Sequence, residues 1–251
     1  MRAELCFGFS STDWENLVQR LDHDEGAWAQ GIGVFERRMK ERFFTCIDAL
    51  VEADTKPDLK ASGSLSEAHC IPGFSIMALC CLLVETLQRF QESPASTASA
   101  GPCTYPKGPC IKPAADTTGQ FIKFLRRPAF GGAFVDDKVA KSFVRGVRNG
   151  ILHEAETRKW VIWREEPNEI VEPLEDGYAL NRTMFYEAIK KEFASYLKDL
   201  HDPSSKLRGR FKKKMNDICG YSGEGERSFQ WQAERHSGAK VNSSRSEATL
   251  A

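Results

Sequence analysis

F-V-R-G-V-R-N-G-I-L-H-E, residues 143–154, separates its apolar and polar side chains at the period of an α-helix. At about 3.6 residues per turn, small and apolar residues fall on one side: Ala140, Phe143, Val144, Val147, Ile151 and Ala155. Polar residues fall on the other side: Lys141, Arg145, Arg148, Asn149 and His153. Leu152 interrupts this polar side, and an apolar residue ringed by polar ones is typical of a contact or a cleft. The stretch predicts a helix that packs one side into a core and presents functional side chains on the other.

Segments with the same helical spacing lie on both sides of this stretch. Helices are expected between Thr12 and Leu21, between Gly26 and Ala53, from Phe74 to Glu92, between Thr117 and Pro128, from Asp136 through the central stretch, and between Asn181 and Pro203. Capping residues mark several of their starts: Thr12 with Glu15, Thr117 with Gln120, Asp136, and Asn181. The helix from Phe74 is apolar nearly all round, which is typical of a helix at the centre of its domain.

Residues 159–164, K-W-V-I-W-R, alternate in the pattern of a β-strand. Together with Ile170 and Val171, which follow the turn sequence E-E-P-N-E, they indicate a small β-hairpin. The expected fold class is therefore all-α: an up-and-down helical bundle with a small β-hairpin inserted before the last helix.

Residues 1–202 contain all of these elements and are expected to form one helical domain. Residues 54–70 and 93–115 lack helical spacing, and the second segment carries five prolines, so both are expected to be loops. Residues 203–251 are short of apolar side chains and include the basic run K-L-R-G-R-F-K-K-K at 206–214. This composition predicts a disordered basic tail, and such a run more often solubilises a chain than binds RNA.

The 251 residues carry a formal net charge of zero and an apolar share of 41%. This composition is sufficient for a core and gives no bulk attraction to nucleic acid or to an anionic membrane. The apolar run from Ile71 to Val84 is shorter than a membrane span, so it predicts a buried helix. The chain starts without the apolar run of a signal peptide, which favours a cytoplasmic protein.

The eight cysteines include no C-x-x-C pair. Cys103 and Cys110 lack histidines at metal-ligand spacing, so neither a metal site nor a cofactor is expected. Cys46, Cys80 and Cys81 lie in apolar helical patterns, which predicts reduced thiols in the core.

The polar side of the central helix carries groups that RNA cleavage by the 2′-hydroxyl requires. His153 can act as acid or base, because imidazole titrates near neutrality. Arg148 offers a planar fork of donors to a phosphate, and Arg145 is expected to add a second phosphate contact. Asn149 precedes His153 by four residues, a spacing that lets its amide orient the ring. Glu85 follows a mostly apolar segment and is expected either to pair with an arginine of the central helix or to reach solvent.

R-N-G-I-L-H, residues 148–153, resembles the signature of the HEPN superfamily: an arginine, a polar residue directly after it, and a histidine a few positions later. The resemblance covers roughly residues 30–200, with the hairpin and the Pro-rich insertion as departures. It implies a small helical domain, usually a dimer, and in many members a metal-independent ribonuclease of toxin–antitoxin or phage-defence systems. For this chain it implies Arg148, Asn149 and His153 as catalytic residues, RNA as substrate, and an antitoxin or regulatory protein as a partner.

One well-placed histidine cannot be both the base and the acid of this reaction. Two-fold pairing of the polar sides around Leu152 brings two histidines and two arginines into one cleft, so a homodimer is expected. The alternatives are a non-enzymatic HEPN-like module that binds a nucleotide or a partner protein, and a structural helical protein. In the structural protein His153 is a solvent-facing residue near a helix end, and Arg145 and Arg148 pair with neighbouring acids.

Overall fold

A computed structural model of the chain describes residues 4–55, 72–92 and 117–219. Its helices are α1 (Ser11–Val18), α2 (Glu25–Met39), α3 (Thr45–Thr55), α4 (Gly73–Gln91), α5 (Thr117–Leu125), α6 (Asp137–Phe143), α7 (Gly150–Glu154), α8 (Arg182–His201) and a last helix at residues 207–219. Its strands are β1 (Glu4–Cys6), β2 (Phe9–Ser10), β3 (Trp160–Trp163), β4 (Val171–Leu174) and β5 (Gly177–Asn181). The prediction of a mostly helical bundle with a small β element is confirmed. The predicted loop at 93–115 and most of the one at 54–70 lie outside the described residues.

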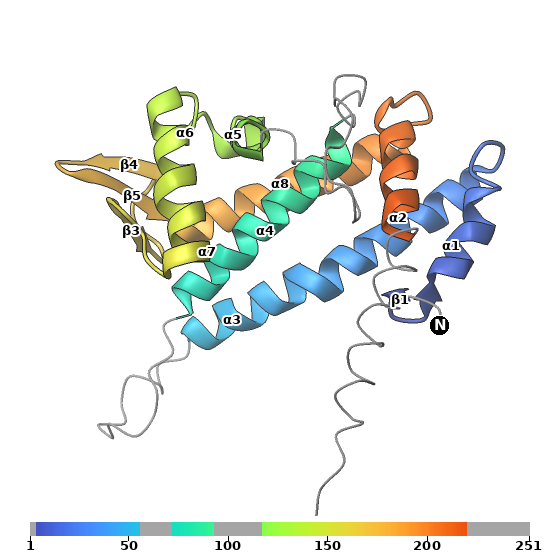
Figure 1. The fold of residues 1–251 in the computed structure, drawn as a ribbon, viewed down its shortest axis with the longest axis horizontal. Helices are drawn as coiled ribbons and strands as arrows, with labels where there is room; N and C mark the ends of the chain where they lie inside the picture. The colour runs from blue at the N-terminus through green and yellow to red at the C-terminus, as the bar shows by residue number, and fades with distance from the viewer. Residues whose placement is uncertain (1–3, 56–71, 93–116, 220–251) are drawn as a thin grey trace, which may run out of the picture.

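Helix α4 lies at the centre of the bundle, as its apolar sequence predicts. It contacts α3, α5, α7 and α8. In Figure 1, α4 and α8 run alongside the long rod that α2 and α3 form, and α6 and α7 cross one end of the bundle next to the small sheet. By length and composition α4 is also a candidate membrane span, and 50% of its most apolar window is buried inside the bundle. Its predicted role as a core helix accounts for this apolar sequence.

Two groups of aromatic rings fill the core. One surrounds Phe35 of α2, whose ring centroid lies 4.4–5.9 Å from those of Phe90, Phe193, Tyr196 and Phe211. The other surrounds Phe143 of α6, whose ring centroid lies 5.2–6.2 Å from those of Phe121, Phe134, Trp160 and Phe185. Packed aromatic pairs stabilise a core beyond the area that they bury. The second group therefore fixes the helix that carries the R-N-G-I-L-H motif.

A π-helical turn, Lys40–Phe44, joins α2 to α3 and shifts the phase of the helix by one residue. Phe35, Met39 and Ile47 lie at helical spacing in the sequence, and all three are buried on either side of the turn. Phe43 continues the same spacing, but within the turn it is only half-buried and Phe44 is buried instead. The prediction that Cys46 is a core thiol is wrong, because the same shift leaves this residue exposed.

The first helix begins at a different cap from the one expected. Ser10, not Thr12, caps α1: its hydroxyl accepts a hydrogen bond from the backbone N–H of Asp13 at 3.3 Å, and its own N–H donates to the Asp13 carboxylate at 2.8 Å. The caps expected at Asp136 and Asn181 are present, and each accepts a hydrogen bond from a backbone N–H in the first turn of its helix. Asn181 also ends β5, so it fixes the junction between the sheet and α8.

The predicted hairpin is wrong in its pairing. The sheet has the order β3-β5-β4, with β3 parallel to β5 and β4 antiparallel to β5, so β3 and β4 do not pair. The hairpin instead joins β4 to β5 through the two-residue turn Glu175-Asp176, and Gly177, which begins β5, has a φ of 144° that favours glycine. Strand β5 was not predicted, and it is the central strand of the sheet.

The prediction of a tail that starts at residue 203 is also wrong, because residues 203–219 belong to the folded bundle. Phe211 in the last helix is fully buried. Arg208 of the basic run is 7% exposed, and its two Nη atoms donate to the two carboxylate oxygens of Glu25, each at 2.8 Å. The basic run is therefore one side of an amphipathic helix. The part of the predicted tail after residue 219 lies outside the described residues.

Candidate functional site

The central stretch forms one continuous helix in three parts: α6, a π-helical turn at Val144–Asn149, and α7. Its predicted apolar side is packed into the core, except for Ala155, which is exposed and ends α7 with a left-handed backbone at φ 54°. The polar side faces outward as predicted: Lys141, Arg145 and His153 are exposed, and Arg148 and Asn149 are half-buried. π-Helical turns are rare and occur often at functional sites.

Two glycines let the chain leading into β3 pack directly on this helix. The backbone N–H groups of Glu156 and Arg158 donate to the carbonyl oxygens of Gly150 and Gly146, each at 3.3 Å. A Cβ atom at Gly146 would lie 2.6 Å from the Arg158 carbonyl oxygen, and one at Gly150 would overlap the Glu156 carbonyl oxygen. The four-residue spacing of these glycines was the sequence signal for this contact, and the prediction missed it. The contact holds the helix from the side opposite α4.

Arg148 is held on the inner edge of the polar side. Its Nε donates to Glu85 Oε1 at 2.6 Å, and its Nη2 contacts the same oxygen. The side chains of Arg148 and Glu85 are 21% and 17% exposed. The expected pairing of Glu85 with an arginine of the central helix is therefore present, and it joins α4 to the π-helical turn.

Asn149 has a different partner from the one predicted. Its amide oxygen accepts a hydrogen bond from Arg148 Nη1 at 2.8 Å. The expectation that this amide orients the His153 ring is not met, because within the described residues no hydrogen bond joins Asn149 to His153. Asn149 and Glu85 together fix the plane of the Arg148 fork. Since a guanidinium has five N–H donors and three are used here, two remain for another acceptor.

His153 lies on α7, one turn beyond Asn149, and its side chain is exposed. In the described part of the chain, no hydrogen bond or ion pair involves its imidazole. Both ring nitrogens are therefore open to solvent and to a ligand. Leu152 beside it is half-buried. Arg148 and His153 thus share one helix, but Arg148 is fixed by neighbours and His153 is not.

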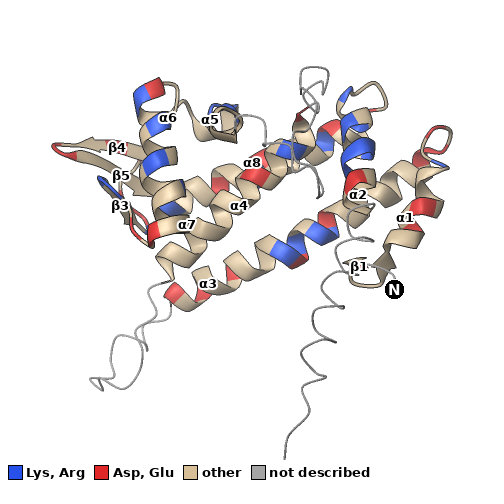
Figure 2. Cartoon of the chain, viewed as in Figure 1, with Lys and Arg blue, Asp and Glu red and all other residues tan. Residues whose placement is uncertain are grey.

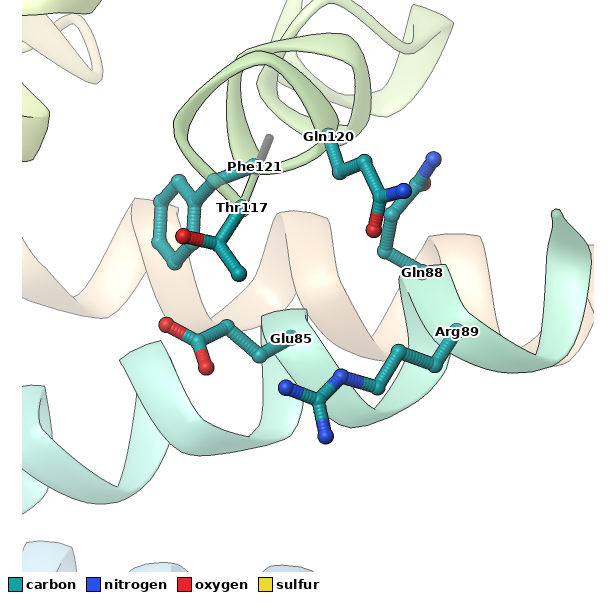
Figure 3. A pocket seen from close by; sticks show the side chains of 6 residues that line it. All are labelled: Glu85, Gln88, Arg89, Thr117, Gln120 and Phe121. Atoms are coloured by element: carbon teal, nitrogen blue, oxygen red, sulfur yellow. The ribbon is translucent and has the colours of Figure 1, made fainter. Parts of the chain in front are cut away.

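A small pocket opens between α4 and α5 next to Glu85 (Figure 3). Its lining consists of Glu85, Gln88, Arg89, Thr117, Gln120 and Phe121. Arg89 is exposed, and within the described residues its guanidinium has no acidic partner. The pocket has a volume of about 10 Å³, space for about one water molecule and far below the range of ordinary small-molecule sites. The prediction missed Arg89, Thr117 and Gln120, because only the packing of α5 on α4 brings them to Glu85.

Arg145 is directed to a separate place. It lines a second pocket on the outer side of α6, together with Lys138, Lys141, Ser142, Gly146, Arg158 and Lys159. It shares no partner with Arg148. The five predicted site residues therefore divide into the Glu85–Arg148–Asn149 group, the exposed His153, and Arg145 in its own basic pocket.

Buried thiols lie behind the site and take no part in its chemistry. Cys80 and Cys81 are fully buried, as predicted. Burial raises the pKa of the Cys81 thiol to about 12, so this residue stays protonated and unreactive near neutral pH. Among the described residues, no cluster of three or more His, Cys, Asp or Glu side chains has the geometry to hold a metal ion.

Comparisons with known proteins identified no relative of this chain. No protein-family model, curated protein or solved structure matches the chain. Any assignment of function rests on the residues and their geometry.

Proposed function

We propose that this chain is a cytoplasmic, metal-independent endoribonuclease with an HEPN-like bundle that acts as a homodimer. The observation that carries the proposal is the contrast on one helix between a fixed cation and a free imidazole. Glu85 and Asn149 hold the Arg148 guanidinium with two of its donors still free, and His153 lies exposed on the next turn. A fixed phosphate-binding fork beside an accessible acid–base group suits RNA cleavage through the 2′-hydroxyl.

In the proposed reaction, His153 of one subunit removes the proton from the 2′-hydroxyl, and the 2′-oxygen attacks phosphorus. The bond from phosphorus to the 5′-oxygen breaks, and the imidazolium of the second subunit's His153 protonates that oxygen. The products are a 2′,3′-cyclic phosphate and a 5′-hydroxyl. Arg148 stabilises the charge that develops on the phosphate, and Glu85 and Asn149 keep its fork in place.

Two features support the dimer in this proposal: the half-buried Leu152 and exposed apolar residues on α4. Leu152 interrupts the polar side of the helix, and α4, which α7 contacts, carries the exposed apolar residues Phe74 and Leu82. These two residues are eight positions apart and so share one face of α4. Exposed apolar side chains on a helix that contacts α7 favour contact with a second protein copy over open solvent.

The test is cleavage of a labelled RNA by the purified protein in excess chelator. His153→Ala is expected to abolish cleavage, and Arg148→Lys to reduce it about 10²-fold or more, because an ammonium cannot replace the bidentate fork. His23→Ala, which removes another exposed histidine, is the matched control and should keep full activity. Cleavage retained by both site variants, or a strict need for Mg²⁺, contradicts the proposal.

A second candidate is a non-enzymatic HEPN-like module that binds a nucleotide or a partner protein. It is favoured by the Glu85–Arg148 ion pair, because an arginine that already has a carboxylate partner also serves a purely structural role. Binding of nucleotide without cleavage of any RNA tested would favour this module.

If the chain is a ribonuclease, a toxin or defence role predicts that expression of the active chain, but not of the His153→Ala variant, arrests growth.

A further inference from the structure

The pocket around Arg145 is lined almost entirely by cations. One wall is a stripe of α6 and the following π-helical turn, with side chains three and four residues apart: Lys138, Lys141, Ser142 and Arg145. The other wall is formed by Arg158 and Lys159, which lead into β3. Figure 2 shows the cationic residues recurring along α6. The pocket has a volume of about 470 Å³ and opens to solvent, so it has room for more than one phosphate group.

No acidic side chain belongs to this lining, although three of its cations pair with acids outside the lining. Lys141 pairs with Asp137 at 3.0 Å, Lys159 pairs with Asp176 at 2.6 Å, and Arg158 pairs with Glu154. These pairs are solvent-exposed and so contribute little to stability, which leaves their cations available to a stronger acceptor. Within the described residues the side chains of Lys138 and Arg145 have no partner at all.

Neutral groups in the pocket also suit a phosphate. The Ser142 hydroxyl oxygen accepts a hydrogen bond from Trp160 Nε1 at 3.1 Å, which leaves its own O–H free to donate. Gly146 at the base of the pocket lets the backbone at Arg158 pack against the helix, which holds the two walls together. Arginine forks, lysine point charges and a hydroxyl donor are the groups that proteins use to contact nucleic-acid phosphates.

We propose that this pocket binds consecutive phosphates of a single-stranded RNA that extends from the cleavage site. That the ligand is RNA rests on the proposed ribonuclease function. That the ligand carries several phosphates is inferred from the cations that line the pocket. Because the net charge of the whole chain is zero, the attraction is local and involves few contacts. Arg145 precedes Arg148 by three residues on one helix, so a strand that leaves the Arg148 fork reaches the pocket within a short distance.

The test measures RNA binding separately from cleavage. A fluorescently labelled oligouridylate is titrated into the His153→Ala protein at several salt concentrations. The His153→Ala variant is used because it is expected not to cleave the probe. For single strands the logarithm of the binding constant falls with that of the salt concentration by about 0.7 for each phosphate contacted. Adding Lys138→Ala and Arg145→Ala is therefore expected to make this slope shallower by about 1.4.

The matched control is Lys206→Ala with Lys213→Ala, which removes the same charge from exposed positions at the far end of the bundle. Equal effects of the two pairs, or an unchanged slope with the pocket pair, overturn the proposal. Tripolyphosphate that binds as tightly as the oligouridylate also overturns it, because the pocket is then a site for free phosphate compounds. If RNA binds with the expected slope but the unmutated protein never cleaves it, the proposed binding pocket is supported and the proposed ribonuclease function is rejected.

Discussion

Arg148 is a side chain whose orientation is set before any ligand arrives. Glu85 holds its Nε and Nη2, and Asn149 accepts from its Nη1. A long flexible side chain loses rotamer freedom when it binds a ligand, and a fork that is already fixed loses less. Glu85 is therefore a positioning residue in the proposed reaction: it acts on RNA only through the guanidinium that it holds.

Glu85→Gln is expected to lower the free energy of unfolding by about 1–3 kcal/mol, because it removes a charged partner from a largely buried hydrogen bond. Cleavage should also fall, with a larger change in kcat than in KM, since the fork loses its position. Urea unfolding and steady-state kinetics measure the two effects. The control, Glu154→Gln, disrupts the exposed pair with Arg158 and should change stability by less than about 0.5 kcal/mol. Equal stability of both variants would show that the inner pair does not hold the helix.

At this scale the sequence predicts exposure and charge better than it predicts partners. For Glu85 the sequence left two outcomes open, an ion pair with an arginine of the central helix or a side chain in solvent, and the structure shows the pair, with Arg148. The choice between the two depends on how closely the central helix packs on α4. The partner of Asn149 was not predictable, because Arg148 and His153 both lie within reach of its amide on the same helix. Nor did the sequence alone reveal the pocket between α4 and α5, which depends on how two distant helices pack.

Among the elements, the central helix depends on the close approach of the chain at Gly150. Gly150→Ala places a Cβ atom against the Glu156 carbonyl, a backbone atom that cannot move aside alone. We expect a loss of about 1–3 kcal/mol in the free energy of unfolding, as overpacked sites show. Gly33→Ala is the control: this residue of α2 has open space around it, so alanine should stabilise the helix by about 0.5–1 kcal/mol. Chemical unfolding of both variants tests the opposite signs, and a neutral Gly150→Ala would rule out the close contact.

The helices could be predicted from the sequence because their period is local. The π-helical turn between α2 and α3 and the pairing of the strands could not be predicted. The π-helical turn at Lys40–Phe44 inserts a residue without any change in composition, so the regular period misplaced Phe43 and Cys46. The parallel pairing of β3 with β5 spans the intervening β4, and local alternation carries no information about it. The available signal for the actual hairpin was Gly177 directly after the polar turn residues Glu175 and Asp176.

For the molecule as a whole, the proposed dimer makes Leu152 a contact residue. Leu152→Asp brings two like charges together at the two-fold contact and removes a burial worth about 1.5–3 kcal/mol per leucine. We expect a monomeric, inactive protein although Arg148 and His153 are intact. Light scattering and the cleavage assay report both properties. Leu174→Asp, at an exposed leucine of β4, should stay dimeric and active. A monomer that still cuts RNA would eliminate the paired-histidine mechanism.

The helix at 207–219 closes the bundle against its first elements. Phe211 packs on Trp14, Trp28 and Phe35, and Trp14 Nε1 donates to Asn216 at 2.7 Å across 202 positions of sequence. A nascent chain on the ribosome therefore lacks one side of its aromatic core until this helix has been translated. Incomplete products of translation are expected to remain unfolded at that end and to be substrates for proteases. For the ribonuclease proposed above, this order predicts that cleavage begins only after residues 207–219 have been translated and packed against the first helices.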